Sequence, residues 1–162
     1  MSASEVTIRA ARLSDANAIA ALTTQLGYTV EPSTVADRLS RMLPRSDQQF
    51  LIADYDGQSV GWIHMGISEY VESGAFVVIG GLVVDRDHRK QGVGRHLLAR
   101  AEEWAAQKGC SIVRLSSSAA RTEAHAFYQH VGYTNIKTQY AFIKSVDRSD
   151  RDGFRAFIPD VT

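Results

Sequence analysis

The sequence has one cysteine, three prolines, no excess charge of either sign and no long hydrophobic run. The lone Cys110 excludes an internal disulfide, and no uncharged stretch approaches the roughly 20 residues of a membrane span. Eighteen basic residues balance eighteen acidic ones, which argues against bulk attraction to nucleic acid or anionic membranes. We expect no secretory leader, and 44% of the 162 residues are hydrophobic. We therefore expect a soluble, cytoplasmic globular protein.

Hydrophobic periodicity predicts strands and helices that alternate along most of the chain. We expect strands within residues 6–9, 50–53, 59–65, 75–84, 110–116 and 135–146, and helices within 14–26, 32–43, 92–108 and 122–130. Asp56-Gly57 between two apolar runs indicates a hairpin. This order predicts an α/β (α+β) fold, a mixed and mostly antiparallel central sheet with helices on both faces.

The predicted elements end well before the end of the sequence. We expect residues 1–146 to form one domain and residues 147–162 to form a C-terminal tail. The tail is first charged and then apolar, with Phe154, Phe157 and Ile158 near its end. It is a packing arm, an edge strand or a disordered end, and the sequence does not decide among them.

A strand, a glycine-bearing turn and a helix follow one another from Leu82 to Arg95. The first turn of a helix has unpaired amide N–H groups and a partial positive charge, so it holds a phosphate readily. Gly92 and Gly94 allow close backbone approach, and three cations surround the same point: Arg89, Lys90 and Arg95. The alternative is a plain strand–helix connection. A dinucleotide fingerprint is excluded because its third glycine is replaced by Leu97.

Two motifs in this region and beyond it resemble those of a known family. The first is Arg89-x-x-Gly92-x-Gly94, preceded by Leu82-x-Val84-Asp85 and followed by two leucines. The second is Ala124-x-x-Phe127-Tyr128-x-x-x-Gly132-Tyr133. Together, on the expected elements, they are similar to the signatures of the GCN5-related N-acetyltransferases. The resemblance implies acetyl-CoA as co-substrate and an acetyl transfer to an amine.

The resemblance also implies a role for particular residues. The amides from Gln91 to Arg95 would wrap the CoA pyrophosphate, so the expected cofactor-binding residues there are Arg89, Lys90, Gln91, Gly92, Val93, Gly94 and Arg95. The backbone of Leu82, Val83 and Val84 would pair with the pantetheine arm, next to a bulge at Gly80-Gly81. Tyr128 would give a proton to the departing sulfur. Its alternative is a core tyrosine with a satisfied hydroxyl.

Two positions depart from the family pattern. Gly80 stands where many members have a glutamate that acts as general base through water. Glu69, Glu72 and His64 are then candidate bases, although each is also compatible with an ordinary surface or packing role. Arg121 stands where the family often has an asparagine that touches the cofactor. It would reach a phosphate, pair with a nearby glutamate or remain solvated.

The sequence thus predicts an N-acetyltransferase that acts by direct attack in a ternary complex on a small or medium amine. The expected acceptor pocket contains Tyr28, Trp62, His64, Glu69 and Glu72. The alternatives are acetylation of a peptide or protein amine, and a catalytically silent acyl-CoA-binding domain. We expect no metal, nucleic-acid or membrane partner. The resemblance allows a homodimer, which the sequence leaves open.

Overall fold

The computed structural model describes residues 5–159, which form two compact units. Unit 1 runs to Leu115 and also includes Pro159, and unit 2 comprises Ser116–Ile158. The boundary falls inside the range 1–146 that the sequence predicted as one domain, and that domain stays a prediction. Residues 1–4 and 160–162, at the ends of the two predicted ranges, lie outside the described residues.

Unit 1 contains a five-stranded sheet in the order β1-β2-β3-β4-β5. The strands are β1 (Thr7–Ala10), β2 (Gln48–Tyr55), β3 (Gln58–Tyr70), β4 (Gly74–Val84) and β5 (Val113–Arg114). The first four pair antiparallel, and β5 pairs parallel to β4. The predicted sheet, mixed and mostly antiparallel, is confirmed.

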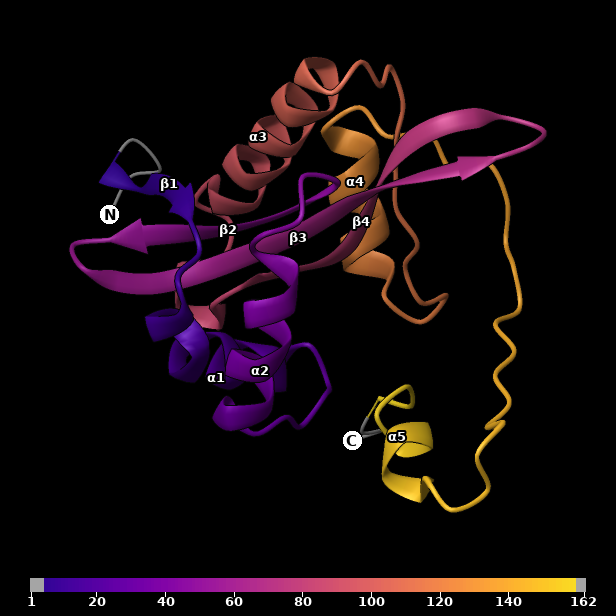
Figure 1. Ribbon diagram of the computed structural model, residues 1–162. Helices are drawn as coiled ribbons and strands as arrows, with labels where there is room; N and C mark the ends of the chain where they lie inside the picture. The colour runs from indigo at the N-terminus through magenta and orange to yellow at the C-terminus, as the bar shows by residue number, and fades with distance from the viewer. Residues whose placement is uncertain (1–4, 160–162) are drawn as a thin grey trace. The chain divides into compact units, whose positions relative to one another are not determined.

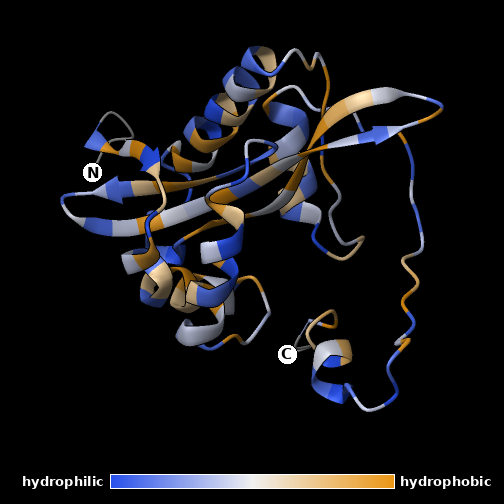
Figure 2. Cartoon of the chain, viewed as in Figure 1, coloured by the Kyte–Doolittle hydropathy of each residue, from blue (hydrophilic) through white to orange (hydrophobic). Residues whose placement is uncertain are grey.

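Helices cover both faces of this sheet, as the sequence predicted (Figure 1). The helices of unit 1 are α1 (Ala16–Gln25), α2 (Pro32–Met42) and α3 (Val93–Gln107). Figure 1 shows α1 and α2 on one face and α3 on the other. Each helix has one apolar side, and Figure 2 shows orange and blue alternating along α3.

Alternate residues of β2 and β3 form the two halves of the core. Phe50, Ile52 and Trp62 are buried together with residues of α1 and α2. Their neighbours along the strands, Leu51 and Ile63, point to the other face because side chains alternate across a strand. The predicted Asp56-Gly57 hairpin is confirmed, and both residues have the positive φ values, 51° and 80°, of a tight turn.

Unit 2 contains the helices α4 (Thr122–His130) and α5 (Arg151–Arg155). The helix predicted over 122–130 is confirmed, and the tail contains a short helix capped by the Asp150 carboxylate, which accepts the Gly153 amide at 2.7 Å. The strands predicted over 135–146 are wrong. A strand needs a hydrogen-bonded partner, and this segment has none among the described residues. The strand predicted over 110–116 is reduced to the two residues of β5.

Candidate active site

The turn before α3 presents a row of unused backbone donors. Lys90 and Gly92 both adopt left-handed backbone conformations, with φ of 61° and 86°. None of the hydrogen bonds in the described chain has an amide from Gln91 to Arg95 as its donor. Successive N–H groups in such a turn form a concave anion site at the positive end of the helix. The geometry therefore fits a phosphate group.

Some side chains of this turn contact the rest of the fold, and others are exposed cations. Val93 is 1% exposed and fixes the start of α3 in the core. Arg89 donates from Nε to the carbonyl oxygen of Val84 at 3.0 Å, which closes the turn against the end of β4. Lys90 and Arg95 are exposed, so they add positive charge without being committed to the fold.

Asp85 ties this turn to the first helix. Its Oδ1 accepts the Gln25 side-chain amide at 3.0 Å, and its Oδ2 lies 2.9 Å from Nδ1 of His88. The Gln25 oxygen in turn accepts the Arg86 amide at 2.9 Å. Hydrogen bonds from Gln25 and then from His88 lower the pKa of Asp85. No sequence pattern points to Gln25, because its partner lies 60 positions away.

The edge of β4 next to the turn has no strand partner among the described residues. β5 pairs with β4 only at Val77 and Val78. The Asp85 amide donates to the Val60 carbonyl at 2.8 Å, and the hydrogen bonds of an antiparallel ladder alternate from there. Leu82 and Val84 therefore direct their N–H and C=O groups to the free edge. Val83, between them, directs its backbone to β3 and its side chain into the core.

The predicted bulge at Gly80-Gly81 is confirmed, and two aromatic rings explain its glycines. His64 pairs with Gly81 and the next residue, Met65, pairs with Ile79, so Gly80 is the extra residue. A Cβ on Gly81 would lie 2.6 Å from Cη2 of Trp62, and one on Gly80 would lie 3.0 Å from Nδ1 of His64. Both rings thus extend from β3 over β4, where only glycine leaves room for them.

Each of these two rings has polar atoms, and only some of those atoms form hydrogen bonds within the described structure. The indole N–H of Trp62 is buried and has no partner in the described structure. His64 Nε2 lies 2.9 Å from the side-chain oxygen of Gln48, and its ring stacks on Phe50 with centroids 5.5 Å apart. Burial lowers the pKa of His64 below its ordinary 6.5. The two rings that extend over β4 thus include a buried donor without a partner in the described structure and a neutral imidazole.

The other predicted acceptor residues lie at different distances from this pair. Tyr28 follows α1 in a loop whose neighbours, Leu26 and Val30, pack on the same core cluster as Trp62. Glu69 lies five residues from His64 along β3, about 17 Å at the usual rise of a strand. Glu72 lies in the turn beyond it. The two acids thus lie near the tip of the hairpin, away from the rings.

Tyr128 belongs to unit 2, on the half-buried side of α4. Its ring contacts Tyr133 edge-on with centroids 6.2 Å apart. Burial raises the pKa of the Tyr128 phenol, and the charge of Arg121 opposes this rise. The phenol is therefore protonated at neutral pH, as a proton donor must be. Arg121 itself is exposed just before α4.

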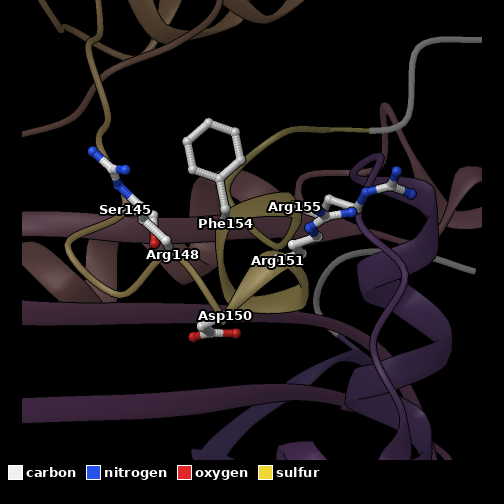
Figure 3. Close-up of a pocket in the computed structure, with 6 residues that line it drawn as sticks. All are labelled: Ser145, Arg148, Asp150, Arg151, Phe154 and Arg155. Carbon is white, nitrogen blue, oxygen red and sulfur yellow. The ribbon is translucent and has the colours of Figure 1, made fainter.

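A shallow pocket in unit 2 lies apart from these motifs in the sequence. Figure 3 shows Phe154 between Arg148 on one side and Arg151 and Arg155 on the other. Across residues 5–159, no three histidine, cysteine or acidic side chains gather in a way that could hold a metal ion. None of the helices in the same range has the length and hydrophobicity of a membrane span.

Comparison with known sequences matches residues 16–133 to the model of the Acetyltransferase (GNAT) family. An uncharacterized N-acetyltransferase of Chlorobaculum tepidum is 30% identical over 86% of this chain and 83% of its own length. An aminoglycoside N(6')-acetyltransferase of Klebsiella aerogenes is 32% identical over 69% and 76%. An aminoalkylphosphonate N-acetyltransferase of Salmonella typhimurium is 33% identical over 60% and 62%.

Solved structures of aminoglycoside 6'-N-acetyltransferases have a similar fold. AAC(6')-Ih from Acinetobacter baumannii matches with a TM-score of 0.77 at 19% identity, over 88% of this chain and 99% of that chain. AAC(6')-Iy, in complex with the bisubstrate analogue CoA-S-monomethyl-acetylneamine, matches with a TM-score of 0.78 at 22% identity, over 86% and 98%. At these identities, the likeness establishes the fold.

Proposed function

The chain belongs to the acetyltransferase (GNAT) family, and we propose that it transfers the acetyl group of acetyl-CoA to a primary amine of a small or medium-sized acceptor. The observation that carries this proposal is the turn before α3, where the amides from Gln91 to Arg95 are unused. Directly beside it lies a free strand edge at Leu82 and Val84. A phosphate site joined to an open ladder suits a cofactor with a diphosphate and an amide-containing arm.

In this proposal, coenzyme A binds mainly to backbone. The turn amides hold the pyrophosphate, and Lys90 and Arg95 add charge from the exposed side of the turn. Arg89 supports the turn through its bond to Val84. The pantetheine amides pair with Leu82 and Val84, while Val83 holds the strand in place from the core. Arg121 is the further cation that we assign to the cofactor, and it is exposed.

Acetyl transfer then proceeds by direct attack of the amine on the thioester carbonyl. The nitrogen lone pair forms the C–N bond, and the C–S bond breaks. A backbone amide of the free edge is the donor that we assign to the carbonyl oxygen, where negative charge develops, and Leu82, two positions from Gly80, offers the outward amide nearest to His64. The Tyr128 phenol, which burial keeps protonated, gives its proton to the departing thiolate and regains one from the new amide nitrogen.

The acceptor pocket of this proposal is aromatic near the acetyl group and acidic farther out. Tyr28, Trp62 and His64 form the near part, and Glu69 and Glu72 lie toward the hairpin tip. An elongated acceptor with several amines fits this arrangement if its second cation reaches Glu72 in the turn, since Glu69, five positions from His64, points to the opposite face of β3. Relatives named as aminoglycoside and aminoalkylphosphonate acetyltransferases support a small amine. Acetylation of a peptide or protein amine is the second candidate, and a silent acyl-CoA-binding domain is the third.

We further propose a cytoplasmic enzyme that forms a homodimer. The single buried cysteine suits a reducing compartment. The exposed apolar side chains of unit 2, among them Ile136, Phe142 and Val146, would be covered in a dimer. Light scattering at several protein concentrations would test the oligomeric state.

An amine panel with thiol detection tests the activity, and Tyr128 tests the mechanism. With small amines, polyamines, aminoglycosides and lysine peptides at saturation, we expect thiol release to be fastest with a small polycationic amine. Tyr128→Phe should lower kcat about a hundredfold or more because the leaving thiolate loses its proton donor. Binding of acetyl-CoA to this variant should be unchanged.

Tyr140→Phe is the matched control, since Tyr140 is a tyrosine of the same unit that is 90% exposed. It should leave kcat unchanged. Full activity of Tyr128→Phe would refute the acid role. Tight binding of acetyl-CoA without thiol release for any amine or peptide would support the silent binding domain instead.

A further inference from the structure

One ring nitrogen of His64 is hydrogen-bonded within the described protein, and the other is not. The side-chain oxygen of Gln48, 2.9 Å from Nε2, can only accept a hydrogen bond. With the Gln48 amide oriented in this way, the arrangement favours the tautomer that carries its proton on Nε2, in which Nδ1 of the neutral ring keeps its lone pair. No hydrogen bond in the described chain uses Nδ1. A base held in one tautomer in this way is ready to accept a proton.

The free nitrogen faces the reacting edge of the sheet. Nδ1 lies 3.0 Å from the point where a Cβ of Gly80 would be, so it looks onto bare backbone of β4. Gly80 is the bulged residue, two positions before Leu82, where the free edge begins to offer its backbone groups. Stacking on Phe50 fixes the plane of the ring. His64 is half-buried and so remains reachable from outside.

We infer that His64 is the general base of the acetyl transfer, and that Gln48 is the positioning residue that fixes its tautomer. This inference rests on the proposed function. At neutral pH the acceptor is an ammonium, which has no lone pair for attack. Nδ1 takes one proton from it and passes that proton to solvent. The freed amine attacks the acetyl carbon, the C–S bond breaks, and the second proton goes by way of Tyr128 to the sulfur. One amide, one thiol and one released proton complete the balance.

The surroundings of His64 keep it in the form that a base requires. Its neighbours on β2 are Gln48 and Phe50, and on β4 they are Gly80 and Gly81, all of them uncharged. Burial alone accounts for the lowered pKa of His64. The ring is therefore neutral at pH 7. Glu69 and Glu72, the other candidates from the sequence, lie farther along the hairpin and leave His64 as the group beside Gly80.

The test compares pH profiles of kcat with the best acceptor of the wild-type enzyme. Since the base works only when unprotonated, wild-type kcat should fall as the pH drops through the lowered pKa of His64. His64→Gln should lower kcat at pH 7 about a hundredfold and leave acetyl-CoA binding unchanged. The deficit should shrink above pH 9, where the acceptor is already neutral. His130→Gln, an exposed histidine at the end of α4, is the control and should match wild type.

Gln48→Glu gives a second readout that does not depend on losing the ring. A carboxylate beside Nε2 stabilises the imidazolium and raises the pKa of His64. The acid limb of the kcat–pH profile should then move to higher pH by about one pH unit. A merely structural role of Gln48 would not produce this shift. An unmoved limb, or His64→Gln within threefold of wild type at pH 7, would overturn the inference and leave the proposed acetyl transfer intact. A wild-type enzyme without turnover would overturn both.

Discussion

At the scale of single residues, the site depends on glycines that make room for rings. Gly81 is the clearest case, because a Cβ there would lie 2.6 Å from the Trp62 indole, inside van der Waals contact. The family resemblance, together with two adjacent small residues, predicted a bulge at Gly80-Gly81. It did not predict which side chains need the space, since Trp62 and His64 belong to another strand and reach β4 only through the register of the sheet.

Gly81→Ala should therefore destabilise the protein. The new methyl group must displace the Trp62 ring from the core, which costs about 1–3 kcal/mol in an overpacked site. Chemical denaturation followed by tryptophan fluorescence measures the change. Gly66→Ala in β3 is the control, because its Cβ would have ordinary contacts at 3.5 Å. It should be neutral or stabilise by up to about 1 kcal/mol. Equal stability of the two variants would contradict this account.

Residues joined by long-range hydrogen bonds were beyond sequence reasoning. Gln48 is 16 positions from His64, and Gln25 is 60 positions from Asp85. Neither glutamine belongs to a motif, and a polar residue in a strand or on a helix is usually solvent-exposed. The turn from Arg89 to Arg95 was recognisable because its glycines and cations are neighbours in the sequence, and its role in holding a phosphate stays a prediction.

At the scale of elements, the predictable parts are those with a periodic signal. The helices α1 to α4, the hairpin after β2 and the strand β4 all lie where apolar spacing and turn residues placed them. The segment 135–146 alternates in the same way but has no partner strand among the described residues. Alternation indicates that a segment can form a strand. It does not indicate whether a neighbouring strand is free to pair with it.

Gly92 is the element-scale test, since it sets the backbone that opens α3. Its φ of 86° is costly for any other residue, so Gly92→Ala should lose about 1 kcal/mol of stability and reshape the turn. Affinity for coenzyme A should fall at least tenfold, as measured by calorimetry. Gly109→Ala replaces a glycine with a similar φ, 78°, at the other end of the same helix. It should lose similar stability and keep full affinity. Equal affinity of both variants would argue against a phosphate site at this turn.

At the scale of the whole molecule, the family assignment joins two motifs that lie in different units. The turn before α3 belongs to unit 1, and Tyr128 belongs to unit 2. The match to the family model spans both, from residue 16 to 133. Sequence reasoning predicted the fold and the cofactor because each motif carries its own chemistry. It could not predict the acceptor, because the residues that we propose to bind it come from separate elements, and the number of residues between these elements can vary.

Titration calorimetry of the purified protein with coenzyme A measures whether the turn before α3 binds the diphosphate of the cofactor. We expect heat of association with one molecule per chain, and much weaker binding of pantetheine, which lacks the diphosphate. This binding should also raise the unfolding free energy by about 2.7 kcal/mol at a ligand concentration of 100 Kd. No measurable association with coenzyme A or acetyl-CoA, or equal affinity for pantetheine, would contradict the claim that the turn at Gln91 to Arg95 holds the cofactor by its phosphates.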